Sequence, residues 1–292
     1  MRLTLRQLEV FVAIARDGNV THAADRIAMS QSAASTALAE LERQFGHPLF
    51  DRYGKRLRLN EIGRAAMPKA LELLDRAAEM EGLLAGKSVP HSLRLGASLT
   101  IGNYLCPSLM ERFRALYPNA QVKLEIDNSS RIAERVAGFD LDMGLIEGHV
   151  THADLILTDW SGDRLAVFCA PMHPLAKRRK ASIDRVLAEE WVVREAGSGT
   201  RQALDLAMAP YRDRWKIALE LEHTEAIKST VAAGRTIGCV SRLALTEALK
   251  SGSLVEIDIV DMGLERRFYF VLNREKYRTP GMEAFIRLCR EG

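Results

Sequence analysis

The most informative part of the chain is residues 5–52, which read LRQLEVFVAIARDGNVTHAADRIAMSQSAASTALAELERQFGHPLFDR. Apolar residues recur in it at helical spacing, which predicts an amphipathic helix over residues 3–17 that ends at Gly18. A second, short helix is expected over residues 20–27, and a third runs from residue 31 to about residue 45. The chain therefore begins with three helices joined by tight turns.

The third predicted helix has small polar side chains in its first turns. Short hydroxyl and amide side chains let a helix enter the DNA major groove and bind phosphates or base edges. A three-residue break, Ala28-Met29-Ser30, precedes this helix, as in a helix-turn-helix, and Ser30 is expected to cap it. The candidate DNA-binding residues are Ser30, Gln31, Ser32, Ser35 and Thr36. Periodicity alone also fits any small three-helix domain with a solvated polar face.

A short basic hairpin is expected after the third helix. Two extended pieces flank a turn that contains Gly54. The hairpin carries Arg52, Lys55, Arg56 and Arg58 within seven residues, although the formal net charge of the whole chain is only +3. A hairpin beside a helix-turn-helix can act as a wing that binds the phosphate backbone. Arg52, Lys55 and Arg56 are therefore candidate DNA contacts, with a merely solvated charged hairpin as the alternative.

A longer helix is expected after the hairpin, with Asn60 as its cap. Its apolar residues follow one another at alternating four- and three-residue steps: Ile62, Ala66, Ala70, Leu73, Ala77, Met80 and Leu84. Such a heptad-like seam is typical of a helix that pairs with another helix. We expect the partner to be a second copy of the chain, in a homodimer or homotetramer, although packing within the same chain is an alternative. Residues 86–90 predict a hinge.

The last two hundred residues alternate apolar strands with amphipathic helices, which predicts open parallel α/β layers. Ligands of such sheets bind beyond the carboxyl ends of the strands, near helix N-termini. Three corners of this kind are rich in hydroxyl side chains: residues 98–100, 127–130 and 197–201. Each corner can be only a helix cap, but three of them facing one cleft favour a binding site.

Length and composition exclude several classes of protein. The 292 residues are enough for two or three domains. No segment has the ~18 uninterrupted apolar residues of a membrane span, and the first residues lack the apolar core of a signal peptide, so we expect a cytoplasmic protein without membrane contact. The four cysteines are far apart in the sequence, which favours buried thiols over zinc ligands or disulfides: Cys106, Cys169, Cys239 and Cys289.

Neither a catalytic site nor a metal site is predicted. The Gly197-Ser198-Gly199 run does not have the spacing of a Gly-x-Ser-x-Gly nucleophile elbow. His149 and His152 lack a third metal ligand nearby in the sequence. We therefore expect no enzymatic activity and no cofactor. A cytoplasmic solute-binding protein is a further alternative, which the first ninety residues oppose.

Residues 5–52 resemble the signature of LysR-type transcriptional regulators over nearly their whole length. The matching elements are the Leu-Arg-Gln-Leu opening, Ala23-Ala24, residues 30–35, Leu41-Glu42 and residues 48–52. The chain departs from the family at Thr36-Ala37, where a basic or amide residue is common, so no base preference is carried over.

The resemblance implies three functional segments. A winged helix-turn-helix that binds double-stranded operator DNA would span residues 1–60, and a linker helix with a hinge would span residues 61–91. An effector-binding α/β domain, two-lobed like periplasmic binding proteins, would span residues 92–292. Its lobe I would comprise about residues 92–161 plus 267–292, and its lobe II about residues 162–266.

Residues 194–201, together with Leu145-Ile146-Glu147-Gly148, resemble the branch of the family that controls sulfur assimilation and carbon fixation. This resemblance and the helix N-termini predict a small oxyanion as effector, sulfite or sulfate first, with a small organic acid or phosphorylated metabolite as the alternative. The candidate effector-binding residues are Ser98, Thr100, Ser129, Glu147, Ser198 and Thr200. Because a lone carboxylate repels anions, we expect Glu147 to be paired with Arg194 or Arg201.

Overall fold

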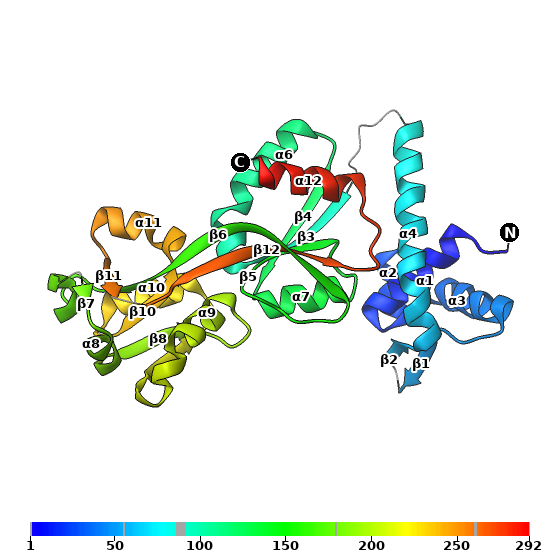
Figure 1. Cartoon of the computed structure of the whole chain (residues 1–292). Helices are drawn as coiled ribbons and strands as arrows, with labels where there is room; N and C mark the ends of the chain where they lie inside the picture. The colour runs from blue at the N-terminus through cyan, green and yellow to red at the C-terminus, as the bar shows by residue number, and fades with distance from the viewer. Residues whose placement is uncertain (1, 55, 86–91, 179, 260–261, 292) are drawn as a thin grey trace. The chain divides into compact units, whose positions relative to one another are not determined.

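The computed structural model describes residues 2–54, 56–85, 92–178, 180–259 and 262–291 (Figure 1). Its contacts divide the chain into two compact units. The first unit comprises Met1–Leu93, Tyr117–Gln121 and Arg274–Phe285, and the second comprises Arg94–Leu116, Val122–Asn273 and Ile286–Gly292.

The first unit starts with three helices, α1 (Leu5–Asp17), α2 (Val20–Arg26) and α3 (Gln31–Phe45). Gly18 ends α1 in the left-handed conformation. The Ser30 hydroxyl accepts a hydrogen bond from the backbone N–H group of Ala33, the third residue of α3, as expected of a helix cap. The three predicted helices are confirmed, as are the end of α1 at Gly18 and the cap of α3 at Ser30, although α1 begins two residues later than predicted and α2 ends one residue earlier.

The expected hairpin consists of β1 (Phe50–Tyr53) and β2 (Arg56–Leu59), which pair antiparallel. Helix α4 (Glu61–Leu84) follows, and the Asn60 side chain caps it by accepting a hydrogen bond from Gly63 N at 2.8 Å. The hinge expected at residues 86–90 lies outside the described residues.

Helix α4 has two apolar faces, of which only one is covered by the described residues; Ala70 of the predicted seam lies on the covered face. Met67, Ala70 and Leu71 are buried within the unit. Leu73 and Met80, both in the predicted seam, are 46% and 64% exposed. Packing within the chain thus accounts for one face of α4 and leaves most of the seam free for another helix.

The rest of the chain forms the larger sheet, whose strands alternate with helices; most of it belongs to the second unit, although residues 280–285 of the last helix belong to the first. In chain order the elements are β3 (Ser92–Ser98), α5 (Leu99–Tyr104), α6 (Cys106–Leu116), β4 (Gln121–Asp127), α7 (Ser129–Ala137), β5 (Met143–Glu147), β6 (Leu155–Cys169), β7 (Lys180–Ala181), α8 (Ile183–Ala188), β8 (Glu190–Arg194), α9 (Gly199–Met208), β9 (Lys216–Leu221), α10 (Thr224–Ala233), β10 (Ile237–Ser241), α11 (Arg242–Ser251), β11 (Val255–Ile259), β12 (Glu265–Asn273) and α12 (Pro280–Arg290). Short 3-10 turns span Pro174–Arg178 and Ala209–Arg214.

The sheet has the strand order β4-β3-β5-β12-β6-β10-β8-β9, and β11 also pairs with β6. Strands β3 and β5 are parallel, as are β10, β8 and β9. The prediction of wholly parallel layers is wrong at the centre, because β12 runs antiparallel to both β5 and β6, and β6 runs antiparallel to β10. These two long strands lie side by side in Figure 1.

The sequence did not reveal the first half of β6. Residues 158–164 are mostly polar or charged, so the apolar pattern of the sequence indicates a strand only from Leu165 onward. In the structure these residues pair with β12 in a ladder whose register shifts once, at Trp160, and many of their side chains stay at least partly exposed. An antiparallel pair of this kind tolerates polar residues that a parallel, doubly covered strand excludes.

The second half of β6 is covered on both faces, and so are β8 and β10. Odd-numbered residues of β6 such as Val167 belong to one apolar cluster, and Phe168 belongs to another. Trp191 and Val192 of β8 divide between the same two clusters. Burial on both faces explains why these strands have nearly continuous apolar runs.

All four cysteines are buried and free, as predicted. Among the described residues, no helix is long and apolar enough to cross a membrane. The same residues contain no group of three or more histidine, cysteine, aspartate or glutamate side chains placed to hold a metal ion.

Candidate functional site

The candidate DNA-binding residues of the helix-turn-helix lie on the exposed side of α3. Ala34, Leu38 and Leu41 are buried, which fixes the opposite side of the helix against the unit. The first turns are exposed at all five predicted positions: Ser30, Gln31, Ser32, Ser35 and Thr36. Ser30 also has a structural role as the cap of α3, so its hydroxyl is partly committed.

The hairpin is attached firmly to the helices behind it. The Phe50 ring lies 5.6 Å from the ring of Phe11 in α1, and Leu57 N donates a hydrogen bond to Gly18 O at 2.8 Å. Arg52 and Arg56 are exposed on its two strands, so they are accessible to a phosphate backbone. The third predicted contact of the hairpin, Lys55, lies outside the described residues.

In the second unit, three hydroxyl groups surround the carboxylate of Glu147, at the end of β5. Ser98 Oγ donates to Glu147 Oε2 at 2.7 Å, and Thr100 Oγ1 donates to Oε1 at 3.1 Å. Thr200 Oγ1, at the start of α9, donates to the same Oε1 at 3.4 Å. We call Ser98, Thr100 and Thr200 the hydroxyl cage. They come from three different elements, and all three are among the candidate effector-binding residues named from the sequence.

The cation of this region is Arg266, in β12, which sequence reasoning missed. Its guanidinium lies 3.5 Å from Glu147 Oε1 and 2.6 Å from Asp163 Oδ2. It also donates to Thr200 Oγ1 at 2.9 Å and to Thr100 Oγ1 at 3.2 Å. One buried guanidinium therefore joins both cage threonines and two carboxylates.

The expectation that Glu147 pairs with Arg194 or Arg201 is wrong. Arg194 pairs with its neighbour Glu195 at 2.8 Å. Arg201 donates to Asp205, one turn further along α9, and to Glu220 of β9. Arg194 and Arg201 each pair with an acidic residue that is near in the sequence or on the neighbouring strand. The cation near Glu147 is instead Arg266, on a strand far along the chain.

One signal for Arg266 was present in the sequence. Alternate residues of β12 share a face, and Arg266 is in phase with the buried Phe268 and Phe270, whereas its neighbour Arg267 is out of phase. An arginine in the inward phase of a strand is expected to be buried with a carboxylate partner.

A cavity of about 410 Å³ lies beside the hydroxyl cage, at the N-termini of α7 and α9. Ser129 and Ser198 both line it. Ser129 Oγ donates to Glu147 O at 2.8 Å. The Ser198 hydroxyl is buried and has no hydrogen-bond partner among the described residues. All six predicted effector-binding residues therefore gather around Glu147 and this cavity; their binding of an effector stays a prediction.

Two features shape the cavity. Gly199 Cα lies so close to the end of β5 that a Cβ there would come within 1.9 Å of Glu147 O, so a side chain would push α9 away. Arg201 also lines the cavity; although burial lowers its pKa, hydrogen bonds to Asp205 and Glu220 raise it overall, so this cation stays charged. Two helix N-termini, Arg201 and the Asp205 carboxylate with which it pairs therefore lie at this cavity.

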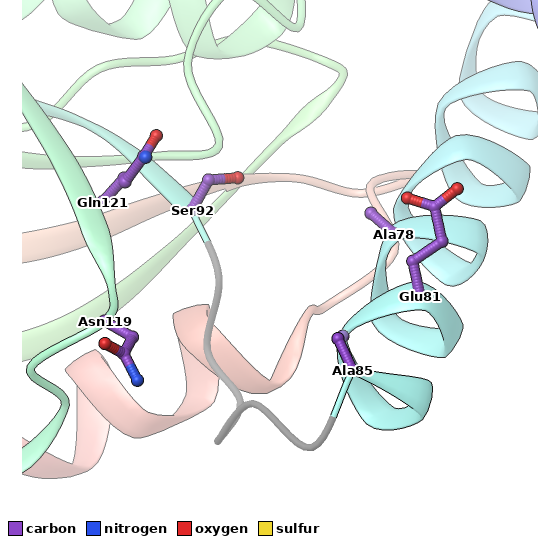
Figure 2. A pocket seen from close by; sticks show the side chains of 7 residues that line it. Ala78, Glu81, Ala85, Ser92, Asn119 and Gln121 are labelled. Carbon is purple, nitrogen blue, oxygen red and sulfur yellow. The ribbon is translucent and has the colours of Figure 1, made fainter.

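A second cavity, of about 640 Å³, lies in the first unit beside α4 (Figure 2). Ala78, Glu81 and Ala85 line it from the helix, and Ser92, with Asn119 and Gln121, lines it from the other side. None of its seven lining residues carries a positive charge, and one carries a negative charge. We assign no effector to this cavity.

Two family models match the chain. The model described as "Bacterial regulatory helix-turn-helix protein, lysR family" matches residues 5–64, and the model described as "LysR substrate binding domain" matches residues 87–292. The first covers α1–α3, the hairpin and the first turn of α4, and the second covers the large sheet with its helices.

Three similar proteins also have names that describe transcriptional regulators or a regulatory domain. The uncharacterized HTH-type transcriptional regulator YeiE of Escherichia coli (strain K12) is 39% identical over 99% of this chain and 98% of its own length. The RuBisCO operon transcriptional regulator of Allochromatium vinosum is 31% identical over 98% and 95%. The regulatory domain of CcmR from Synechocystis PCC6803, solved in complex with 2-PG, is 27% identical, with a TM-score of 0.64 over 69% of this chain and 97% of that domain. The chain belongs to the LysR family of bacterial transcriptional regulators, in the branch that includes regulators of carbon fixation.

Proposed function

We propose that this regulator binds a small oxyanion between the two lobes of its regulatory domain, with sulfite and sulfate as first candidates, and changes its operator binding in response. The observation that carries the proposal is the cavity at the N-termini of α7 and α9, which adjoins the hydroxyl cage. Backbone N–H groups at helix N-termini and nearby hydroxyls form a ready anion site.

The unpaired hydroxyl of Ser198 supports this assignment. A buried hydroxyl without a partner costs free energy, and a ligand oxygen would recover that cost. The oxyanion would lie against Ser198 and Ser129, next to the cage. The acceptor already seated in the cage is a carboxylate, so the hydroxyl geometry suits an oxyanion.

The charges near the cavity favour sulfite over sulfate. Glu147 and Asp163 are two carboxylates, and Arg266 is one guanidinium, so this trio has a formal charge of −1 when all are ionised. A dianion is repelled by such a group. Sulfite is partly protonated near neutral pH, and its protonated form has one negative charge and an O–H group that can donate to a carboxylate.

A phosphorylated metabolite or small organic acid is the second candidate. The cavity of about 410 Å³ has room for a ligand larger than sulfite. The CcmR regulatory domain binds 2-PG, and the RuBisCO regulator resembles this chain over nearly its whole length. The same helix N-termini would serve an organic anion.

The proposed DNA target is an interrupted inverted repeat. A dimer joined through the exposed seam of α4 would present two copies of α3 to symmetric half-sites. The exposed residues of α3 would read the bases, and Arg52 and Arg56 would contact the backbone.

Calorimetry on the full chain tests the effector. We expect sodium sulfite to bind more tightly than sulfate, thiosulfate or small carboxylates. Ser198→Ala should weaken binding about tenfold or more, because a hydrogen bond to a charged group contributes about 1.5–3 kcal/mol. Ser92→Ala, in the second cavity, is the matched control and should bind as the wild type does. Binding of organic anions alone, or sulfite binding that Ser198→Ala leaves unchanged, would contradict the oxyanion assignment.

A further inference from the structure

The hydroxyl cage is already occupied by a part of the chain. We infer that the Glu147 carboxylate is a built-in competitor of the effector, which fills an oxyanion site that a free anion can take only by displacing it. The inference rests on the proposed function in one respect, namely that an anion enters this region from the neighbouring cavity.

The hydrogen bonds of the cage leave it no donor to spare. Each hydroxyl has a single proton to donate. Ser98, Thr100 and Thr200 all direct theirs to Glu147, at 2.7, 3.1 and 3.4 Å. Their oxygen atoms in turn accept from Glu147 N and from Arg266. While the carboxylate stays in place, a free anion receives no hydrogen bond from the cage.

Removing the carboxylate would leave a balanced and empty site. Arg266 keeps a second carboxylate, because its guanidinium donates to Asp163 Oδ2 at 2.7 Å. Asp163 is itself held by a hydrogen bond from Ser241 Oγ at 3.0 Å. The region would then change from a formal charge of −1 to neutral, with three hydroxyl donors free. Such a site binds anions better than the native one does.

The same carboxylate oxygen ties two parts of the domain together. Thr100 at the start of α5 and Thr200 at the start of α9 both donate to Glu147 Oε1. Gly148 follows Glu147 with a φ of +78°, so the chain turns sharply away at this point. A free anion in the cage would accept hydrogen bonds from both threonines, but unlike Glu147 it would not be part of β5. Displacement of Glu147 therefore changes how α9 is held against β5.

The test uses the full chain and inorganic sulfate as the probe. We expect Glu147→Ala to bind sulfate at least about tenfold more tightly than the wild type, because donors and charge balance are both gained. Glu147→Gln removes the charge but still fills the cage, so its gain should be smaller. The double variant Glu147→Ala/Thr100→Ala should lose the gain. Glu134→Ala, an exposed carboxylate on α7, is the matched control and should bind as the wild type does.

Unfolding measurements keep the test decisive if Glu147→Ala is less stable. Sulfate should then raise its Tm more than it raises that of the wild type, since a ligand stabilises the state that binds it. Sulfate affinity and Tm shift no greater than in the wild type would overturn the inference.

The outcomes for the two proposals are separable. A wild type that binds neither sulfite nor sulfate contradicts the proposed effector, yet the built-in competitor stands if Glu147→Ala binds sulfate through Thr100. A wild type that binds sulfite, together with a Glu147→Ala variant that binds no oxyanion, supports the proposed effector and overturns the competitor.

Discussion

Arg266 provides the positive charge for two buried carboxylates. Glu147 and Asp163 have side chains that are 1% and 3% exposed, and the guanidinium lies within 3.5 Å of the first and 2.6 Å of the second. Charges removed from water are tolerated only when they are paired and hydrogen-bonded. The charge of the two buried carboxylates is therefore compensated by one side chain, that of Arg266.

Arg266→Met should lower the free energy of unfolding by about 3–5 kcal/mol, because it leaves buried carboxylates without their cation. Urea unfolding measures the loss. The neighbouring Arg267→Met is the control: its pair with Asp159 has side chains that are 53% and 51% exposed, and exposed pairs contribute about 1 kcal/mol or less. Equal losses in the two variants would show that Arg266 is not the cation on which this region depends.

The cysteines should be chemically inert in the folded chain. Burial raises the pKa of Cys106, Cys239 and Cys289 to about 12 and that of Cys169 to about 11. Because the thiolate is the reactive form, a thiol reagent at pH 8 should leave all four unmodified until a denaturant is added. The measurement is a count of modified thiols before and after unfolding. Rapid modification of any one in the native protein would contradict the buried positions.

The hairpin and α3 are expected to bind DNA in different ways. Arg52→Ala or Arg56→Ala should weaken binding to all sequences and lower the slope of log affinity against log salt by about 1 each. Gln31→Ala or Ser35→Ala should weaken specific binding with less effect on the slope. Fluorescence anisotropy over a salt series separates the two effects. Arg114→Ala, an exposed arginine of α6, is the control, and an unchanged slope in both hairpin variants would remove the wing from the DNA interface.

Helix α4 is expected to hold two copies of the chain together. Leu73→Asp or Met80→Asp would place a charge in the predicted seam, and an unpaired buried charge costs several kcal/mol, so about a hundredfold or more in dimer affinity. Sedimentation measures the dimer, and operator binding should fall with it. Ala78→Asp adds the same charge on another side of the helix, beside the second cavity, and should leave the dimer intact. Intact dimers in both seam variants would place the interface elsewhere.

Local sequence signals predicted the helices well and the central strands less well. Ser30 and Asn60 are cap residues whose chemistry acts within a few positions, so the starts of α3 and α4 could be predicted from the sequence. The first half of β6 takes its stability from β12, about a hundred positions further along the chain, which no local pattern reports. The phase of β12 indicates that Arg266 is buried, but its partners could not be predicted for the same reason, since they come from β5, β6 and two helix starts.

The predicted hydroxyls came together because each stands at the start of a helix that follows a strand of one sheet. Ser98 is the last residue of β3 and directly precedes α5, Ser129 begins α7 one residue after the end of β4, and Ser198 directly precedes α9. The topology of an α/β sheet brings such corners to one edge. What the sequence could not supply was the direction of each hydroxyl, and three of them point at Glu147 rather than into the cavity.

The chain combines a helix-turn-helix of the LysR family with a LysR substrate-binding domain, and the proposed function links the two in one equilibrium. Linkage requires that an effector which alters operator affinity is itself bound more or less tightly in the presence of DNA. Coupling free energies of this kind are typically about 1–3 kcal/mol, or about 5- to 150-fold in affinity.

The most direct measurement is operator affinity of the full chain, on the DNA directly upstream of its own gene, with and without sulfite. We predict specific binding to an inverted repeat and a change of about fivefold or more when sulfite is added. Ser198→Ala should bind the same DNA but respond weakly. Specific binding that sulfite and sulfate leave unchanged, or a Ser198→Ala response equal to that of the wild type, would contradict the account.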